Sequence, residues 1–295
     1  MKRTNGKANL YKNPFNIDIL SLEKNESLAQ FFALFVDLKS HIDPYIYFKK
    51  LYKLFICEME NNKDKIKFVK SFDEYQKNDK ISAFLTIEEG GILGDDFEKF
   101  EEVYDLGVRL ITLTWNYENS LGYPNNGTIN KKCLKSFGKK VIEWMNHKGM
   151  IIDVSHLSDG GFKDVLNISK KPFVASHSNA RAICPNTRNL TDEMLKGIGN
   201  SGSVVGLNFY HKFLNNENVS TVNSMVIHIK HMVNHAGIES VALGTDFDGV
   251  TGKMEISKID EMYKLYNKLK KEGFTSKELD KIWYRNSERI LKEVL

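Results

Sequence analysis

Cysteine is scarce in this sequence: only Cys57, Cys133 and Cys184 occur among 295 residues, and no two of them form a C-x-x-C pair. This spacing argues against a disulfide framework and against a thiolate metal cluster. No apolar run approaches the roughly 18 residues of a membrane span, and the start of the chain lacks the apolar segment of a signal peptide. We therefore expect a cytoplasmic protein with no membrane partner.

The sequence also lacks a strong charge of either sign and several well-known catalytic motifs. Its 42 basic and 38 acidic residues give a net charge of +4, and no basic run is interleaved with aromatic residues, so we expect no nucleic-acid partner. There is no G-x-S-x-G turn and no glycine-rich phosphate loop after a strand. These absences disfavour a serine hydrolase, a P-loop NTPase and a dinucleotide-dependent oxidoreductase.

What the sequence does contain is a regular alternation of apolar strands and amphipathic helices. A hydrophobic fraction of 41% and a charged fraction of 27% are typical of one globular domain, here residues 1–295. Strict alternation predicts an α/β fold of the (β/α)8 TIM-barrel type, with a doubly wound open sheet as the alternative. We count seven strands, one short of a closed barrel: about 27–36, 81–87, 108–114, 150–154, 172–175, 203–207 and 241–244.

Metal-capable side chains follow four of these predicted strands. His156 and His177 each come directly after a strand in the stretch 150–188, Glu88 ends the strand at 81–87, and Asp246 follows the last one. The carboxyl ends of parallel strands meet at one face of the sheet, so the four side chains are expected to share a pocket. Imidazoles and carboxylates are common zinc ligands, and paired metal ions activate water in hydrolases.

Other candidates are less typical of a site. Strand alternation turns only one of Glu88 and Glu89 inward. His231 and His235 have the spacing of a zinc-binding helix within residues 222–236, but the general-base Glu of H-E-x-x-H is missing between them. The pair His41 and Asp43 follows a polar stretch and precedes a proline, so it does not lie at a strand end.

Six segments in order resemble the membrane (renal) dipeptidase family. They are Ile87–Gly91, Gly107–Thr114, Asp153–His156, Ser176–Ser178, Thr187–Leu190 and Gly244–Gly249, and the similarity extends from about residue 27 to the end. The family consists of binuclear zinc dipeptidases with an amidohydrolase-like barrel. The resemblance thus implies a zinc-dependent enzyme that hydrolyses dipeptides with a metal-activated hydroxide, and it leaves a homodimer open.

The resemblance also implies a role for each candidate residue. Glu88 would bridge two zinc ions and take part in catalysis, while His156 and His177 would complete the coordination of one ion. Asp246 would transfer protons. Arg188 would bind the terminal carboxylate of the dipeptide, a task that suits a bidentate guanidinium. For substrate binding, the resemblance further suggests Tyr210, and Asn116 as a stand-in for the family's histidine after the third strand, where this chain has Trp115 and Asn116.

The largest departure from the family lies at its first strand. That strand normally ends in an Asp-Gly-His-x-Asp type motif that binds the other zinc, and nothing before Ser27 matches it. We expect the strand to be either missing from a sequence that begins too late, which the intact remainder favours, or degenerate. One zinc ion rather than two is then expected here. The alternatives are a catalytically impaired homologue with a single-zinc site and another amidohydrolase activity.

Overall fold

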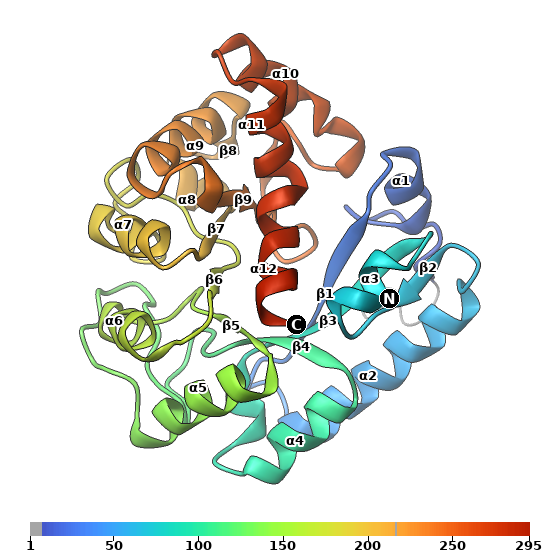
Figure 1. The fold of residues 1–295 in the computed structure, drawn as a ribbon, viewed down its shortest axis with the longest axis vertical. Coiled ribbons are helices and arrows are strands. Elements are labelled where there is room, and N and C mark those ends of the chain that lie inside the picture. The colour runs from blue at the N-terminus through green and yellow to red at the C-terminus, as the bar shows by residue number, and fades with distance from the viewer. Residues whose placement is uncertain (1–7, 216) are drawn as a thin grey trace.

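The computed structural model describes residues 8–215 and 217–295, and it forms a curled parallel sheet surrounded by helices (Figure 1). Seven strands follow one another in the sheet, and every pairing is parallel. In spatial order they are β1 (Ala29–Phe35), β3 (Ile81–Glu88), β4 (Val108–Thr112), β5 (Ile151–Asp153), β6 (Val174–Ala175), β7 (Val204–Leu207) and β9 (Val241–Leu243). The seven predicted strands and the barrel-type α/β class are confirmed.

Most helices lie on the outside of this sheet, as the ring of coiled ribbons in Figure 1 shows. The helices that the sequence predicts between strands are all present. They are α2 (Pro44–Asn61), α4 (Phe97–Asp105), α5 (Ser136–Lys148), α6 (Asp159–Ile168), α7 (Asp192–Asn200) and α9 (Val222–Ala236). Their apolar faces pack on the outer face of the strands and form the larger of two hydrophobic cores.

Several short elements were not predicted. Strand β2 (Ile66–Phe68) pairs with the first residues of β3, and the helix α3 (Phe72–Gln76) follows it. The other short elements are α1 (Ile19–Lys24), α8 (His211–Leu214), β8 (Val219–Ser220), β10 (Lys253–Met254) and 3-10 helices at Gly90–Leu93, Ile238–Ser240 and Ile259–Glu261.

The sequence does predict two closing helices, near residues 259–271 and 276–295. The first is α10 (Tyr263–Lys271). The second is divided into α11 (Ser276–Asp280), a π-helical turn at Lys281–Arg285 and α12 (Asn286–Val294).

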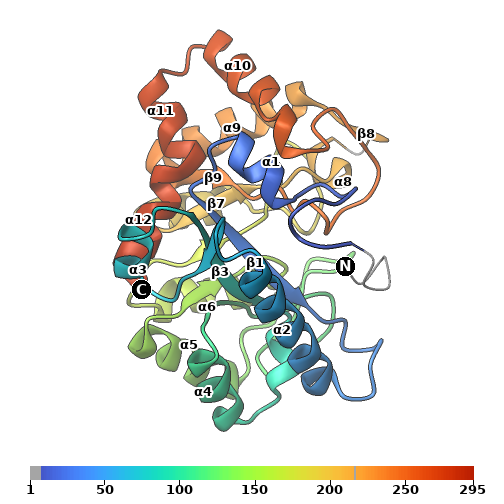
Figure 2. The same cartoon turned by 90° about the vertical axis from the view of Figure 1, so that its right-hand side faces the viewer.

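The sheet does not close into a full barrel. Among the described residues, β1 pairs only with β3 and β9 pairs only with β7, so a gap separates these two edge strands. Helix α12 runs through the middle of the view in Figure 1 and lies at the left edge of the view in Figure 2, beside one end of the strands. Its apolar face packs against a layer of inward-facing strand residues: Phe84, Leu110, Ile151, Val174, Val204 and Ala242. This inner core supports the amino-terminal half of the sheet from inside.

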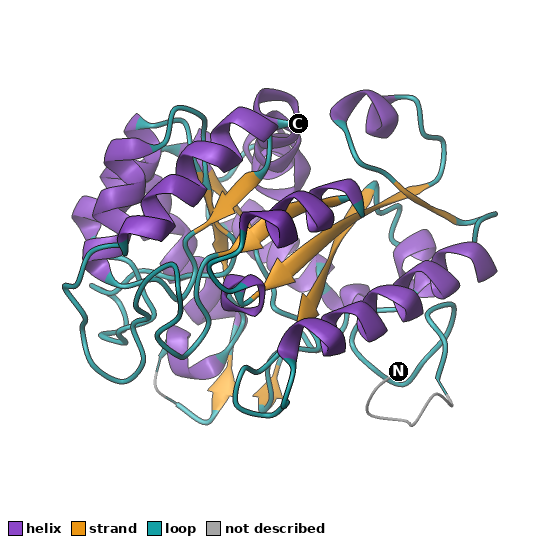
Figure 3. Ribbon diagram, turned by 90° about the horizontal axis from the view of Figure 1, so that it is seen from below, coloured by secondary structure: helices purple, strands orange, loops and turns teal. Residues whose placement is uncertain are grey.

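A polar layer lies above this inner core, toward the carboxyl ends of the strands. Thr112, Asp153 and Ser176 occupy it, each two positions after an apolar residue of the inner core. Gly206 and Gly244 adjoin it because a Cβ at either position would overlap the carbonyl oxygen of Ser176. Figure 3 shows the strands from below, enclosed by helices. Across the part of the chain that is described, no helix is long and apolar enough to cross a membrane.

Helix α9 contributes one fully buried histidine to the fold. His228 Nε2 donates to the carbonyl oxygen of Leu214 at 2.8 Å, and its Nδ1 accepts from the Ala180 amide at 3.1 Å. Both ring nitrogens are therefore satisfied in the neutral form. Burial lowers the pKa of His228 from 6.5 to about 4.

This shift predicts a pH-dependent loss of stability. Below pH 6.5 the unfolded chain binds a proton at His228, whereas the folded chain binds it only near pH 4. The free energy of unfolding therefore falls as the pH drops through this window. The shift corresponds to roughly 3 kcal/mol. Urea unfolding at both ends of the window measures it: His228→Gln should lose less stability on acidification by about that amount. The exposed His147→Gln should behave like the parent, and equal losses for all three proteins would contradict the assignment.

Candidate active site

All seven candidate residues from the sequence line one cleft at the carboxyl ends of the strands. Glu88 is the last residue of β3, while His156, His177 and Asp246 stand in the turns just after β5, β6 and β9. The loops after β4, β6 and β7 supply the rest. The cleft residues from this set are Glu88, Asn116, His156, His177, Arg188, Tyr210 and Asp246. The expectation of a shared pocket is confirmed.

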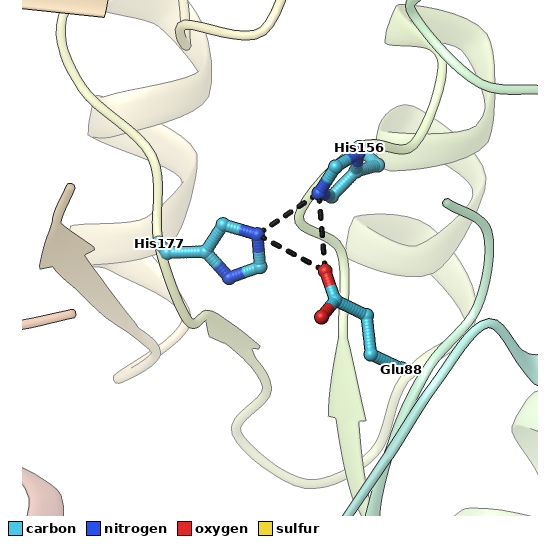
Figure 4. Close-up of side chains that lie close together, drawn as sticks. All are labelled: Glu88, His156 and His177. Carbon is cyan, nitrogen blue, oxygen red and sulfur yellow. Dashed lines mark hydrogen bonds and ion pairs between the residues drawn. The ribbon is translucent and has the colours of Figure 1, made fainter. Parts of the chain in front are cut away.

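Glu88, His156 and His177 converge on a single point (Figure 4). His156 Nε2 lies 2.9 Å from His177 Nε2. Glu88 Oε1 lies 3.3 Å from His156 Nε2 and 3.6 Å from His177 Nε2. For comparison, ligand atoms bound tetrahedrally at about 2.0–2.1 Å from one zinc ion stand about 3.3 Å apart. The three spacings therefore match the edges of a tetrahedral coordination shell.

A chain of hydrogen bonds orients the ring of His177. Asp153 is fully buried and accepts four bonds, from Thr112 Oγ1, the Ser155 amide, and both the amide and Oγ of Ser176. Since the single hydroxyl proton of Ser176 goes to Asp153, at 2.6 Å, Ser176 Oγ accepts from His177 Nδ1 at 2.7 Å. His177 therefore carries its proton on Nδ1, and Nε2 presents a lone pair to the cleft.

Asn116 orients the other ring in the same sense. Its side-chain oxygen lies 3.2 Å from His156 Nδ1 and accepts from that nitrogen when the ring carries its proton there. Burial lowers the pKa of both histidines, and that of His156 falls well below 6.5, so both rings are neutral at pH 7. The two Nε2 atoms and the Glu88 carboxyl thus face one another at 2.9–3.6 Å. This donor set fits a divalent ion such as zinc, whose ligands are neutral imidazoles held by hydrogen bonds at their other nitrogen.

The structure distinguishes the two adjacent glutamates. Glu89 is fully buried and accepts from the Gly91 and Trp115 amides and from Asn119 Nδ2, at 2.6–3.0 Å. It adopts a φ of 90° and holds the turn after β3 together. Glu88 alone faces the two histidines, where burial raises its pKa. Only one of the two glutamates faces the site, as strand alternation predicts, and it is Glu88, the one that the family resemblance implies.

Asp246 occupies a strained backbone position on the opposite side of the cleft. Its φ is 57°, in the left-handed region that side chains other than glycine rarely adopt, and His156 is similar at 70°. Asn208 Nδ2 donates to Asp246 Oδ2 at 3.1 Å. Burial raises the pKa of Asp246 to about 6. Strain of this kind persists where the surroundings enforce it, as they often do at functional sites.

Arg188 presents unused hydrogen-bond donors to the cleft. The side chain is buried and lies over the ring of Phe213, with 5.3 Å from Cζ to the ring centroid. Its Nε and Nη2 are enclosed and meet no hydrogen-bond partner among the described residues. Burial lowers the pKa of Arg188 to about 10, so the group stays cationic at neutral pH. A buried guanidinium with free donors is suited to an anionic group of a bound molecule.

Three supporting residues carried no assigned role from the sequence. Asp153 and Ser176 orient His177, and Asn208 holds Asp246. Asp153 and Ser176 do lie beside the site histidines in the chain, inside recognised segments. The sequence does not reveal their hydrogen bonds, because these bonds form only when β5 pairs with β4 and β6. Asn116 is likewise placed against a histidine ring, a contact that the sequence could not reveal.

A curled parallel α/β sheet with two histidines and a carboxylate at its carboxyl edge defines a metallohydrolase-type barrel protein. The chain belongs to the membrane dipeptidase family, peptidase family M19, whose sequence model matches residues 1–295. Family and fold together place it among the metal-dependent dipeptidases.

Two curated relatives match over most of the chain. An uncharacterized protein of Klebsiella pneumoniae, encoded in the pqqA 5′ region, is 36% identical over 228 residues, which are 74% of this chain and 84% of the relative. An uncharacterized dipeptidase of Schizosaccharomyces pombe is 29% identical over 271 residues, which are 83% of this chain and 64% of the relative. The chain thus spans less than two thirds of the yeast protein.

Solved structures share the fold at lower identity. The dipeptidase AC, a metallo peptidase, superposes with a TM-score of 0.90 at 23% identity, covering 96% of this chain and 90% of that one. A metallo peptidase from Rhodobacter sphaeroides, solved with a phosphinate mimic of the dipeptide L-Ala-D-Ala, gives 0.87 at 22% identity, covering 96% and 92%. The overall fold of this chain is therefore that of these solved structures.

The hydrogen-bond chain to His177 predicts the effect of Asp153→Asn. The new amide group would donate to Ser176 Oγ, whose own proton would then turn to His177 Nδ1 and leave the ring protonated on Nε2. Zinc affinity, measured by competition with a chelating dye, should fall about 10–100-fold. Ser176→Ala should weaken binding as well, whereas the exposed Asp95→Asn should not. Unchanged affinity in Asp153→Asn would refute the orienting chain.

Proposed function

We propose that this protein hydrolyses dipeptides with a zinc-activated water, and that Glu88, His156 and His177 hold the ion. The observation that carries the proposal is the convergence of two imidazole lone pairs and one carboxylate oxygen at 2.9–3.6 Å. Ser176 and Asn116 lie at the Nδ1 atoms of the two rings, so both Nε2 atoms face Glu88. A divalent cation bound among the three atoms fits this arrangement.

The described residues supply ligands for one ion at this point. Among them, the site cluster contains only Glu88, His156 and His177 as ligand atoms within 4.8 Å of one another. We therefore propose single-zinc occupancy for the chain as described. Zinc in such a site polarises a carbonyl and lowers the pKa of water to near 7. A second ion would need ligands from elsewhere, and the gap between β1 and β9 borders the same cleft.

The surrounding residues have distinct tasks in the proposed reaction. Asp246, held by Asn208, accepts the proton of the attacking water and delivers it to the leaving amine. Arg188 binds the free carboxylate of the substrate through its unused donors. Asn116 acts by orienting His156, and with Tyr210 it borders the space for the substrate. The phosphinate dipeptide mimic in the Rhodobacter sphaeroides metallo peptidase agrees with a substrate of this size.

The alternative that a specific observation favours is an impaired homologue. The open edge between β1 and β9 adjoins the site, and a single ion gives weaker activation of water than a pair. In that case zinc would bind with one ion per chain while dipeptide turnover would be absent. The remaining possibility is another amidohydrolase activity. Assays with lactones and other amidohydrolase substrates test it, because their hydrolysis does not require Arg188 to bind a carboxylate.

Metal removal tests the ligand set directly. Chelation should abolish hydrolysis of an L,L or L,D dipeptide panel, and one equivalent of zinc should restore it. Glu88→Gln should lose turnover and the zinc bound in the cleft, because the amide lacks the charge that neutralises the ion. The exposed Glu143→Gln on α5 is the matched control and should retain both. Full zinc retention in Glu88→Gln would remove the proposed site.

Substrate charge tests Arg188. Replacing it with Met should raise KM and lower kcat/KM roughly 100-fold for dipeptides, the cost of losing a charge-assisted bidentate contact. Dipeptide amides, which lack the free carboxylate, should be poor substrates for the parent and nearly equal for both proteins. If Arg188→Met lowered turnover of dipeptides and their amides by the same factor, the carboxylate-binding role would be wrong.

A further inference from the structure

A second cluster of metal-capable side chains lies on the outer surface, between helices α7 and α9. Asp192 is the first residue of α7, and His231 and His235 stand one turn apart on α9. His231 Nε2 lies 2.7 Å from Asp192 Oδ1, and His235 Nε2 lies 3.4 Å from Asp192 Oδ2. The two rings stack with centroids 4.2 Å apart. None of these residues lines the active-site cleft.

The hydrogen bonds prepare His235 as a ligand. Its Nδ1 donates to the backbone carbonyl of His231 at 2.9 Å, which leaves Nε2 as the lone-pair atom in the neutral ring. Nε2 lies 3.4 Å from Asp192 Oδ2, a position that a proton on the ring or a bound cation stabilises. A backbone carbonyl at the other ring nitrogen is the usual support of a metal-bound histidine.

Position and exposure also suit an ion. The side chains of His231 and His235 are each 18% exposed, and that of Asp192 is 33% exposed, so an ion could enter from solvent and keep one or two waters. Asp192 stays ionised because its hydrogen bond to His231 lowers its pKa, and it sits at a helix amino terminus. Lys196 lies one turn further along α7, and its positive charge disfavours the binding of a metal ion beside Asp192.

We propose that Asp192, His231 and His235 form a second, exterior site for a zinc-class divalent ion, which clamps α7 to α9. Two imidazoles and one carboxylate favour Zn²⁺, Co²⁺ or Ni²⁺ over Mg²⁺ and Ca²⁺, which prefer oxygen ligands. For a tetrahedral ion to bind, the 2.7 Å distance between His231 Nε2 and Asp192 Oδ1 must lengthen by about 0.6 Å. The 3.4 Å distance between His235 Nε2 and Asp192 Oδ2 already fits. The site joins the helix after the Arg188 loop to the helix before β9 and Asp246. It does not depend on the proposed catalytic function.

The test removes the cleft site first, so that only the exterior site can bind. In the His156→Ala/His177→Ala double variant, Zn²⁺ titration with metal analysis should find one ion per chain at micromolar concentration. Adding His235→Gln or Asp192→Asn to this background should abolish that binding. Adding the exposed His147→Gln should not. Absence of zinc binding in the double variant, or its survival in both exterior variants, would overturn the proposal.

A second readout separates a clamp from adventitious binding. Zinc at 100 times its Kd should raise the Tm of the double variant by about 5 °C, and the rise should vanish with His235→Gln. Mg²⁺ should produce no shift in either protein. In the otherwise unaltered enzyme, His235→Gln should keep dipeptide turnover, because its ring lies outside the cleft. Zinc binding without any Tm rise would contradict the clamp.

Discussion

The proposed site depends on two histidine ring nitrogens that face each other at 2.9 Å beside a carboxyl group. Each ring is buried and neutral, and each is held at its far nitrogen by a neighbour: Ser176 for His177 and Asn116 for His156. Two ring nitrogens and a carboxyl oxygen this close together form the ligand set that the proposed function requires. The layers of side chains below the site hold Glu88, His156 and His177 in place.

The barrel supplies the rigidity for this arrangement from below. An apolar inner layer, packed on α12, supports a polar layer in which buried Asp153 joins β4, β5 and β6 by four hydrogen bonds. The site histidines stand immediately above it. Gly206 and Gly244 leave room for the Ser176 carbonyl, so that this part of the chain can come close to its neighbours. The candidate metal ligands thus stand at or just after the strand ends, and Asn116, Arg188 and Tyr210 come from the following loops. Within the described residues, no strand pairs with the free edges of β1 and β9.

Much of this could be predicted from the sequence, for physical reasons that differ between features. Buried parallel strands are continuous apolar runs, so all seven were found, and side chains directly after them had to share one face. Strand alternation showed that only one of Glu88 and Glu89 faces inward, and the family resemblance favoured Glu88. Short β2 and α3 were missed because three to five residues carry too little periodicity, and the π turn at 281–285 leaves no pattern. Contacts between distant segments were also beyond reach. Asn116 against His156 and Asp192 against His231 and His235 each depend on how separate elements pack. His231 and His235 showed the spacing of a zinc-binding helix in the sequence, but the carboxylate that α7 places beside them could not be foreseen.

The protonation state of the two site rings is the most direct test of this account, and nitrogen-15 NMR of the histidine side chains measures it. In the metal-free protein at neutral pH, His156 and His177 should both be neutral with the proton on Nδ1. One equivalent of zinc should move the Nε2 resonances of these two rings, while that of buried His228 stays unchanged. A proton on Nε2 of either ring, a charged ring, or Nε2 resonances that ignore zinc would contradict the ligand set on which the proposed function rests.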